Sequence, residues 1–188
     1  MKKRIVIFAS GGGTNAQNVI EHFQQSDVAK VVSVFCNNKN AHVLQRAKAL
    51  KTQVVLFNKE GLRAEGGVLK SLQLASPDLI VLAGFLLKLP KTILNHFPDK
   101  VINIHPALLP KYGGKGMYGR HVHERVVANH ETETGITVHY VNEAYDEGTV
   151  ILQKKVAVAT NDTSKTIAKK VHRLEYEWLP KVIENLLT

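Results

Sequence analysis

Apolar runs of strand length alternate with segments of helical periodicity through the first half of the chain, and this alternation restricts the fold more than any other feature. The apolar runs predict strands at residues 4–9, 31–36, 53–57, 79–83 and 101–104. The segments between them predict helices at residues 15–24, 42–50, 67–74 and 90–96. Pro90 suits the first turn of the last helix, where its missing N–H is not needed. Strands that alternate with helices are typical of a parallel sheet with crossover helices, so we expect an α/β fold with a Rossmann-like N-terminal half.

The pattern changes after Pro110. A Gly-rich segment, residues 113–119, leads into a predicted helix at residues 121–129. Residues 135–141 and 150–158 have the pattern of strands and are expected to pair antiparallel across the turn between them. The sheet is therefore predicted to be doubly wound and mostly parallel, with a late antiparallel strand pair.

A long helix is predicted at the end of the chain. Asn161, Asp162 and Thr163 are good capping residues for its first turn. The apolar residues that follow at helical spacing predict a packing stripe: Ile167, Val171, Leu174, Trp178, Val182 and Leu186. This helix would close the sheet, and 188 residues with a hydrophobic fraction of 44% favour a single domain, residues 1–188.

The chain is basic, with a formal net charge of +9. Lys and Arg are scattered, without an RNA-binding aromatic motif or a zinc-finger pattern, so the charge favours small anionic substrates over nucleic acid. The basic and apolar residues 1–9 are too short for a secretory signal, and no other run approaches a membrane span. The single Cys36 excludes an intramolecular disulfide. We expect a cytoplasmic protein that binds neither membrane nor nucleic acid; its oligomeric state is left open.

Residues 10–15, Ser-Gly-Gly-Gly-Thr-Asn, come directly after the first predicted strand and open the first predicted helix. Glycines let the backbone turn tightly and approach a ligand, and a helix N-terminus offers free amides to an anion. The segment has neither the dinucleotide-binding nor the Walker spacing. A phosphate site is the preferred interpretation, and an ordinary strand-to-helix turn is the alternative.

An amide and an imidazole, Asn103 and His105, stand two residues apart at the end of the fifth predicted strand. In an extended chain this spacing points both side chains to one face, and Pro106 ends ladder pairing where they emerge. They would share one edge of a crevice, either as a structural pair or as catalysts. The acidic turn that contains Asp146 is ordinary turn chemistry by itself, but a hairpin beside the sheet would bring Asp146 toward His105. A carboxylate there favours the imidazolium form and orients the ring.

Metal binding and covalent catalysis have little support in the sequence. His121, His123 and His130 lack a cysteine cluster or a His-Glu-x-x-His pattern and are expected to be solvated histidines. Ser10 lacks the context of a nucleophile elbow, and Cys36 has no evident partner that would activate its thiol.

Five segments, in their order and spacing, together resemble the folate-dependent formyltransferase family, and within it the phosphoribosylglycinamide formyltransferases. They are residues 10–15 (SGGGTN), 83–87 (AGFLL), 103–110 (NIHPALLP), 135–139 (GITVH) and 146–151 (DEGTVI), so the resemblance covers essentially the whole chain. It implies transfer of a formyl group from the co-substrate 10-formyltetrahydrofolate to the amine of glycinamide ribonucleotide in purine synthesis, without a metal or a covalent intermediate.

The resemblance also implies roles for individual residues. The nucleotide phosphate would be held by Gly13, Thr14 and Asn15. The folate would be held by main-chain groups of Leu86, Leu87 and Leu89 and by Asn103. The catalytic residues would be Asn103, His105 and Asp146, and the ribonucleotide would also contact Glu175 and its neighbour His172.

Two departures and three alternatives accompany this interpretation. Leu87 stands where the family often carries a basic residue, and the loop at residues 113–120 is longer and more basic than in some relatives. A methionyl-tRNA formyltransferase would be expected to add a C-terminal domain, and a formyltetrahydrofolate hydrolase an N-terminal regulatory domain; we expect neither in this chain. A basic RNA-binding module without activity is the third alternative, and the presence of Asn103, His105 and Asp146 together argues against it.

Overall fold

The computed structural model describes residues 1–64 and 66–188, and these residues form a seven-stranded sheet. Its strands are β1 (Lys3–Ala9), β2 (Ala29–Cys36), β3 (Gln53–Leu56), β4 (Leu79–Leu82), β5 (Val101–His105), β6 (Glu133–Tyr140) and β7 (Val150–Ala157). The order across the sheet is β3-β2-β1-β4-β5-β6-β7. The pairs from β3 to β5 are parallel, whereas β6 pairs antiparallel with both β5 and β7. The predicted fold class, mostly parallel with a late antiparallel pair, is confirmed.

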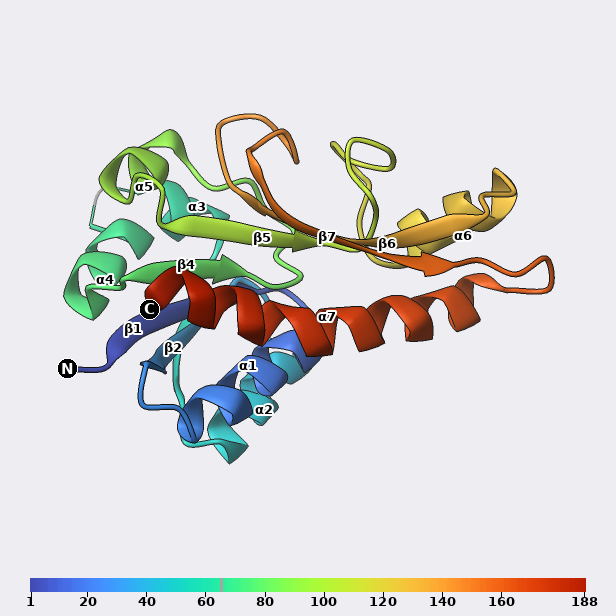
Figure 1. Ribbon diagram of the computed structural model, residues 1–188. Helices are drawn as coiled ribbons and strands as arrows, with labels where there is room; N and C mark the ends of the chain where they lie inside the picture. Colours follow the sequence, from blue (N-terminus) through green and yellow to red (C-terminus); the bar gives the residue numbers. More distant parts are fainter. Residues whose placement is uncertain (65) are drawn as a thin grey trace.

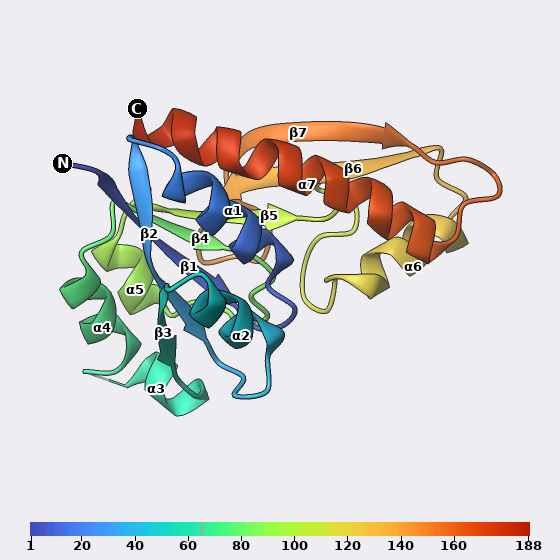
Figure 2. The same cartoon turned by 90° about the horizontal axis from the view of Figure 1, so that it is seen from below.

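Helices cover both faces of the sheet (Figure 1; Figure 2). They are α1 (Thr14–Gln24), α2 (His42–Ala49), α3 (Lys59–Arg63), α4 (Val68–Ala75), α5 (Lys91–His96), α6 (Arg120–Ala128) and α7 (Ser164–Leu187). One hydrophobic cluster joins the sheet to α1, α2, α6 and α7, and a second joins it to α3, α4 and α5. The fold is therefore layered, with a separate core on each side of the sheet.

The alternation of side chains along β1 explains why the sheet needs helices on both faces. Ile5 and Ile7 lie in the cluster with α1 and α7, whereas Val6 and Phe8 lie in the cluster with α4 and α5. All four side chains are fully buried. Because successive residues of a strand point to opposite faces, a continuous apolar run requires cover on both sides.

The strand order reverses its direction at β1, whose two neighbours are β2 and β4. The chain builds β1, β2 and β3 toward one edge and then crosses to β4 on the other side of β1. Such a switch point leaves a crevice outside the carboxyl ends of the strands, where open α/β sheets bind their ligands. The loops after β1 and β4 and the end of β5 lie at this edge.

The C-terminal helix α7 runs along α1, α6 and the late strand pair (Figure 2). Thr163 caps it through a reciprocal hydrogen-bond pair with Thr166, close to the predicted start. The predicted packing stripe is confirmed, since its residues are buried or packed against the core. Trp178 is one of the partly buried members, and the Lys154 ammonium lies 3.7 Å from the centre of its ring.

Two details of the secondary structure differ from the sequence predictions. Helix α3 was not predicted; its five residues are too few to show a helical period, and the Asn58 side chain caps it by accepting from the Gly61 N–H. Pro90 lies just before α5 and not in its first turn, since its ψ of 148° is extended. Among the described residues, no helix is both long and apolar enough to span a membrane.

Candidate active site

A cavity of about 1110 Å³ opens at the carboxyl ends of β1, β4 and β5. Its walls come from residues 11–15 after β1, 83–86 after β4, 103–106 at the end of β5, 114–119 before α6, Arg120 and His123 of α6, 145–146 between β6 and β7, and the N-terminal half of α7. Most of the predicted site residues line it: Gly13, Thr14, Asn15, Leu86, Asn103, His105, Asp146, His172 and Glu175. The fold thus brings together residues from both ends of the chain.

The glycine-rich turn presents the N-terminus of α1 to this cavity. Gly13 precedes the helix in a left-handed conformation with φ of 74°, and no side chain caps the first turn. Gly13 is also a packing position, because a Cβ atom there would lie 2.4 Å from the Val43 Cβ. At Gly11 and Gly12 an added Cβ would meet nothing within 4 Å. The turn therefore has an open backbone at Gly11 and Gly12 and an uncapped helix end, both of which suit an anion.

Ser10 ties this turn to the loop after β4. Its hydroxyl accepts from the Leu86 N–H at 3.0 Å and donates to the Asn37 side-chain oxygen at 2.6 Å. Leu86 lines the cavity, with its side chain half exposed. Leu87 and Leu89 are not among the lining residues, and Leu89 is buried in the core beneath. A folate-binding role for these leucines stays a prediction.

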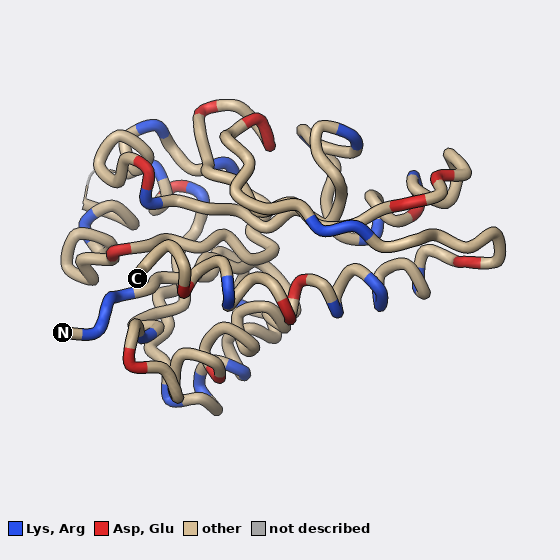
Figure 3. The backbone as a smooth tube through the Cα atoms, in the orientation of Figure 1, with Lys and Arg blue, Asp and Glu red and all other residues tan. Residues whose placement is uncertain are grey.

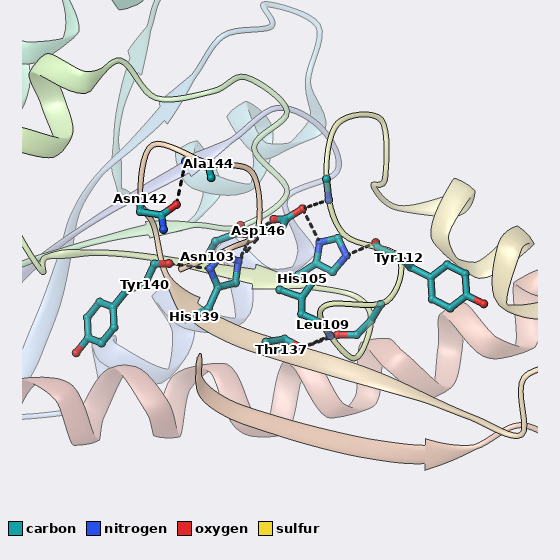
Figure 4. Close-up of polar contacts among 12 residues, drawn as sticks. Asn103, His105, Leu109, Tyr112, Thr137, His139, Tyr140, Asn142, Ala144 and Asp146 are labelled. Atoms are coloured by element: carbon teal, nitrogen blue, oxygen red, sulfur yellow. Dashed lines mark hydrogen bonds and ion pairs between the residues drawn. The ribbon is translucent and has the colours of Figure 1, made fainter. Parts of the chain in front are cut away.

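Asn103, His105 and Asp146 converge on one wall of the cavity (Figure 4). The Asp146 Oδ2 atom lies 3.7 Å from His105 Nδ1, and Asp146 Oδ1 lies 3.4 Å from Asn103 Nδ2. The backbone N–H of Gly114 also donates to Asp146 Oδ2, at 2.9 Å. The hairpin between β6 and β7 thus delivers the carboxylate to the strand end, as the sequence predicted.

A fourth polar side chain, His139, belongs to this group and was not predicted. Strand β6 pairs it directly with Asn103, whose Nδ2 atom lies 3.1 Å from His139 Nε2. His139 Nδ1 donates to the Tyr140 carbonyl at 2.7 Å, so in the neutral ring Nε2 accepts from Asn103. His139 ends one of the five segments that carry the family resemblance, but only the strand register reveals its partner.

The electrostatics of this group differ from the sequence expectation. Burial lowers the pKa of His105 below its ordinary value of 6.5, and the attraction of Asp146, which acts in the opposite direction, offsets only part of that effect. For Asp146, burial acts to raise the pKa, but the contacts with His139, His105 and Gly114 outweigh it and lower the pKa. The resting group therefore holds an ionised Asp146 and a neutral His105, not the expected imidazolium. The reason is that His105 is only 3% exposed.

The neutral His105 ring has a defined tautomer. Its Nε2 atom lies 2.7 Å from the Tyr112 carbonyl oxygen. A carbonyl can only accept, so Nε2 carries the proton and donates it. Nδ1 is left with a free lone pair on the side of Asp146.

A buried carboxylate on α7 closes the other side of the cavity. Glu175 is only 4% exposed and accepts from Asn15 Nδ2 at 3.0 Å and from His172 Nδ1 at 2.7 Å. The bond with Glu175 raises the pKa of His172 above 6.5. Glu175, His172 and Asn15 thus form one hydrogen-bonded group that joins α7 to the turn after β1.

His123 contradicts the expectation of a solvated histidine, which holds for its neighbours His121 and His130. It is 4% exposed, lines the cavity, and has a buried Nδ1 atom with no hydrogen-bond partner. Burial lowers its pKa. Its place on the inner face of α6 follows from the helical spacing with Val122 and Val126, both fully buried, and that spacing was the available signal. Over the described part of the chain, no group of three or more His, Cys, Asp or Glu side chains could hold a metal ion.

The loop before α6 and the first residue of α6 add positive charge to the cavity. Gly114, Gly116 and Gly119 adopt positive φ angles in the loop, and Lys115 and Arg120 line the cavity. Among the described residues, Lys and Arg are distributed over many elements (Figure 3).

The chain is similar to known formyltransferases over nearly its whole length. A family profile described as formyl transferase matches residues 3–183. The phosphoribosylglycinamide formyltransferase of Bacillus subtilis is 33% identical, with 98% of this chain and 95% of that protein covered. The chloroplastic phosphoribosylglycinamide formyltransferase of Arabidopsis thaliana is 35% identical over 97% of this chain, which spans 64% of that longer protein.

A solved structure agrees over the full length of both chains. Glycinamide ribonucleotide transformylase 1 from Geobacillus kaustophilus superposes with a TM-score of 0.90 at 31% identity, with 100% of each chain covered.

Proposed function

The chain belongs to the formyl transferase family, and from that premise we propose that it transfers a formyl group from 10-formyltetrahydrofolate to the amine of glycinamide ribonucleotide, a step of purine synthesis. The observation that carries the proposal is the meeting of Asn103, His105 and Asp146 in a cavity that begins at an uncapped helix N-terminus. The whole chain acts as one formyltransferase domain.

The cavity has the size and the two kinds of surface that this pair of substrates needs. Its volume of about 1110 Å³ exceeds the roughly 300–1,000 Å³ of most small-molecule sites, as expected when two substrates bind together. The turn at Gly13, Thr14 and Asn15 receives the phosphate, and the buried Glu175 receives polar groups of the ribonucleotide. The folate lies against the loop after β4, where Leu86 and Phe85 supply apolar surface.

In the proposed reaction, the amine nitrogen bonds to the formyl carbon, the bond from that carbon to folate N10 breaks, and a proton moves from the amine to N10. His105 starts neutral, takes the amine proton on Nδ1, and gives it to N10 as the bond from N10 to the formyl carbon breaks. The ionised Asp146, 3.7 Å away, stabilises the imidazolium that forms. This order differs from a mechanism that begins with imidazolium, because burial lowers the pKa of His105 in the resting protein.

Asn103 serves the tetrahedral intermediate. Its amide bonds to His139 at 3.1 Å and more weakly to Asp146 at 3.4 Å. The weaker contact is the one that a developing oxyanion replaces, so Asn103 donates most strongly when the charge is present. Binding both substrates in one cavity also supplies orientation.

A cytoplasmic location and small-molecule partners alone, without membrane or nucleic acid, complete the proposal. The single Cys36 is buried and unpaired, which suits a reducing compartment. The charge is dispersed and does not favour an RNA partner.

A comparison of acceptors tests the function. Purified protein is given 10-formyltetrahydrofolate with glycinamide ribonucleotide, with initiator methionyl-tRNA, or with water alone, and tetrahydrofolate and formate are measured. Appreciable turnover is expected only with the ribonucleotide. Preferential formylation of the tRNA, or formate as the main product, would overturn the assignment.

The matched control is Asp146→Asn, which keeps the outline of the side chain. If the turnover belongs to this cavity, the variant should bind the ribonucleotide nearly as well and lose turnover. Unchanged turnover in a folded Asp146→Asn protein would contradict the proposed mechanism, even where the acceptor preference holds.

A further inference from the structure

Tyr112 has an unusual backbone for a tyrosine and contacts His105 through that backbone. Its φ of 58° lies in the left-handed region, which a bulky residue occupies only when its surroundings hold it there. In this conformation its carbonyl oxygen lies 2.7 Å from His105 Nε2. The backbone of one loop residue therefore determines which nitrogen of His105 carries the proton.

The side chain of Tyr112 is held by hydrogen bonds at the turn between α6 and β6. Its hydroxyl donates to Glu131 Oε1 at 2.8 Å and accepts from Asn129 Nδ2 at 2.8 Å. Lys111 pairs with both oxygens of Glu131, at 3.0 and 3.1 Å. We call Tyr112, Asn129, Glu131 and Lys111 the clamp. None of its residues lines the cavity, so the family reaction does not account for this cluster of contacts.

We propose that Tyr112 is a positioning residue for His105: the clamp holds its strained backbone so that the carbonyl fixes the Nε2–H tautomer and leaves Nδ1 free toward Asp146. Without the clamp, Tyr112 relaxes toward a common backbone conformation and its carbonyl turns away. Neutral His105 then populates both tautomers, with the proton on Nδ1 in one and on Nε2 in the other. A ring protonated on Nδ1 has no lone pair there to take a proton from a substrate.

The same contact acts on the charge state of His105. The hydrogen bond to Tyr112 raises the pKa of His105 against the larger opposite effect of burial. The titratable groups that face the ring from other elements are Asp146, His139 and Glu175, with His123 on α6. A Tyr112 substitution leaves all of these in place, so a change in the His105 titration reports on the carbonyl contact.

The tautomer of His105 is the first measurement, because it needs no substrate. In protein labelled with 15N-histidine, NMR correlations between ring nitrogens and carbon-bound protons identify the protonated nitrogen. The wild type should show His105 with Nε2–H alone near pH 7.5. In Tyr112→Phe, which lacks only the hydroxyl, both tautomers should appear and the His105 titration should move to lower pH.

The kinetic measurement rests on the proposed function. In Tyr112→Phe, kcat should fall on the order of 10-fold, less than the roughly 10²-fold cost of a 1 Å misplacement, with KM for the ribonucleotide within about 2-fold. Glu131→Ala, which breaks the clamp from its other side, should reproduce both effects. The double variant should be no worse than Tyr112→Phe, because the two act through one hydrogen bond.

The matched control is Glu133→Ala, which removes a similar ion pair, with Lys155 at 2.7 Å, from the neighbouring strand. It should leave the tautomer and kcat unchanged. An unchanged His105 tautomer in a folded Tyr112→Phe protein overturns the positioning role, whatever the substrate is. A changed tautomer in a protein that formylates no ribonucleotide supports the positioning role and refutes the function.

Discussion

Gly12 and Gly13 are adjacent, yet the structure separates their roles, and alanine substitution tests that separation. At Gly13, the alanine Cβ would lie 2.4 Å from Cβ and Cγ2 of Val43 and 2.8 Å from its Cα atom, with φ fixed at 74°. At Gly12, the added Cβ meets nothing within 4 Å, and the residue lines the cavity. Gly13→Ala should therefore damage the fold, and Gly12→Ala should damage phosphate binding.

The magnitudes follow from the two geometries. For Gly13→Ala, the left-handed backbone costs about 1–2 kcal/mol and overpacking about 1–3 kcal/mol. The sum, about 2–5 kcal/mol, corresponds to a fall in Tm of roughly 4–20 °C in a chain of this size. Gly12→Ala should change stability by less than about 1 kcal/mol, because alanine also restricts the unfolded chain. Under the proposed function its methyl group would stand in the path of the phosphate, so Kd for the ribonucleotide should rise by about 10-fold, or 1.4 kcal/mol.

Two assays on each variant suffice. Differential scanning calorimetry gives Tm, and isothermal titration calorimetry gives Kd for glycinamide ribonucleotide and, separately, for tetrahydrofolate. The folate affinity of Gly12→Ala is the internal control and should stay near that of the wild type. A wild-type Tm in Gly13→Ala would refute the packing argument. Unchanged ribonucleotide affinity in Gly12→Ala, or equal loss of both ligands, would refute a phosphate site at this turn.

Four further predictions concern titrating groups. In the proposed mechanism neutral His105 is the active form, and burial lowers its pKa, so kcat/KM should fall on the acid side only below pH 6.5. Asp146→Asn should move this acid-side fall in kcat/KM to still lower pH, since the carboxylate raises the pKa of His105. It should also reduce kcat on the order of 10²-fold. A fall that begins above pH 6.5 in the wild type would contradict the neutral His105. Glu175 raises the pKa of His172, so the pair stabilises the folded protein fully below pH 6.5, and this stabilisation is lost as pH rises through the pKa of the folded state. The free energies of unfolding of wild type and His172→Gln, from urea titrations, should therefore converge from pH 6 to pH 9. A difference that stays constant with pH would exclude the ion pair. Asp162 has its pKa lowered from 3.8 to about 2 by its hydrogen bonds at the start of α7, so Asp162→Asn should lower Tm at pH 7, with the deficit shrinking as pH falls from 4 toward 2; a deficit independent of pH would contradict this.

Local patterns were enough to predict much of the site. The strand period placed Asn103 and His105 on one face, and β5 bears this out. The Gly-rich turn lies between β1 and α1, as its place between a predicted strand and a predicted helix indicates. A hairpin packed beside the sheet predicts Asp146 near His105, and the two side chains lie 3.7 Å apart. Each of these inferences uses residues close in sequence or a connection with little freedom.

The sequence by itself determined the alternation of strands and helices, the faces of each strand and the chemistry at the strand ends, because those properties depend on periods of two and of 3.6 residues. Only the tertiary structure decided that His139 pairs with Asn103, that Glu175 meets Asn15 across 160 residues, and that the Tyr112 carbonyl lies 2.7 Å from His105 Nε2. It also reversed the expected charge of His105. A carboxylate nearby is visible as a residue type, but the larger effect is the loss of solvent around the ring, and burial is a property of the whole packed chain.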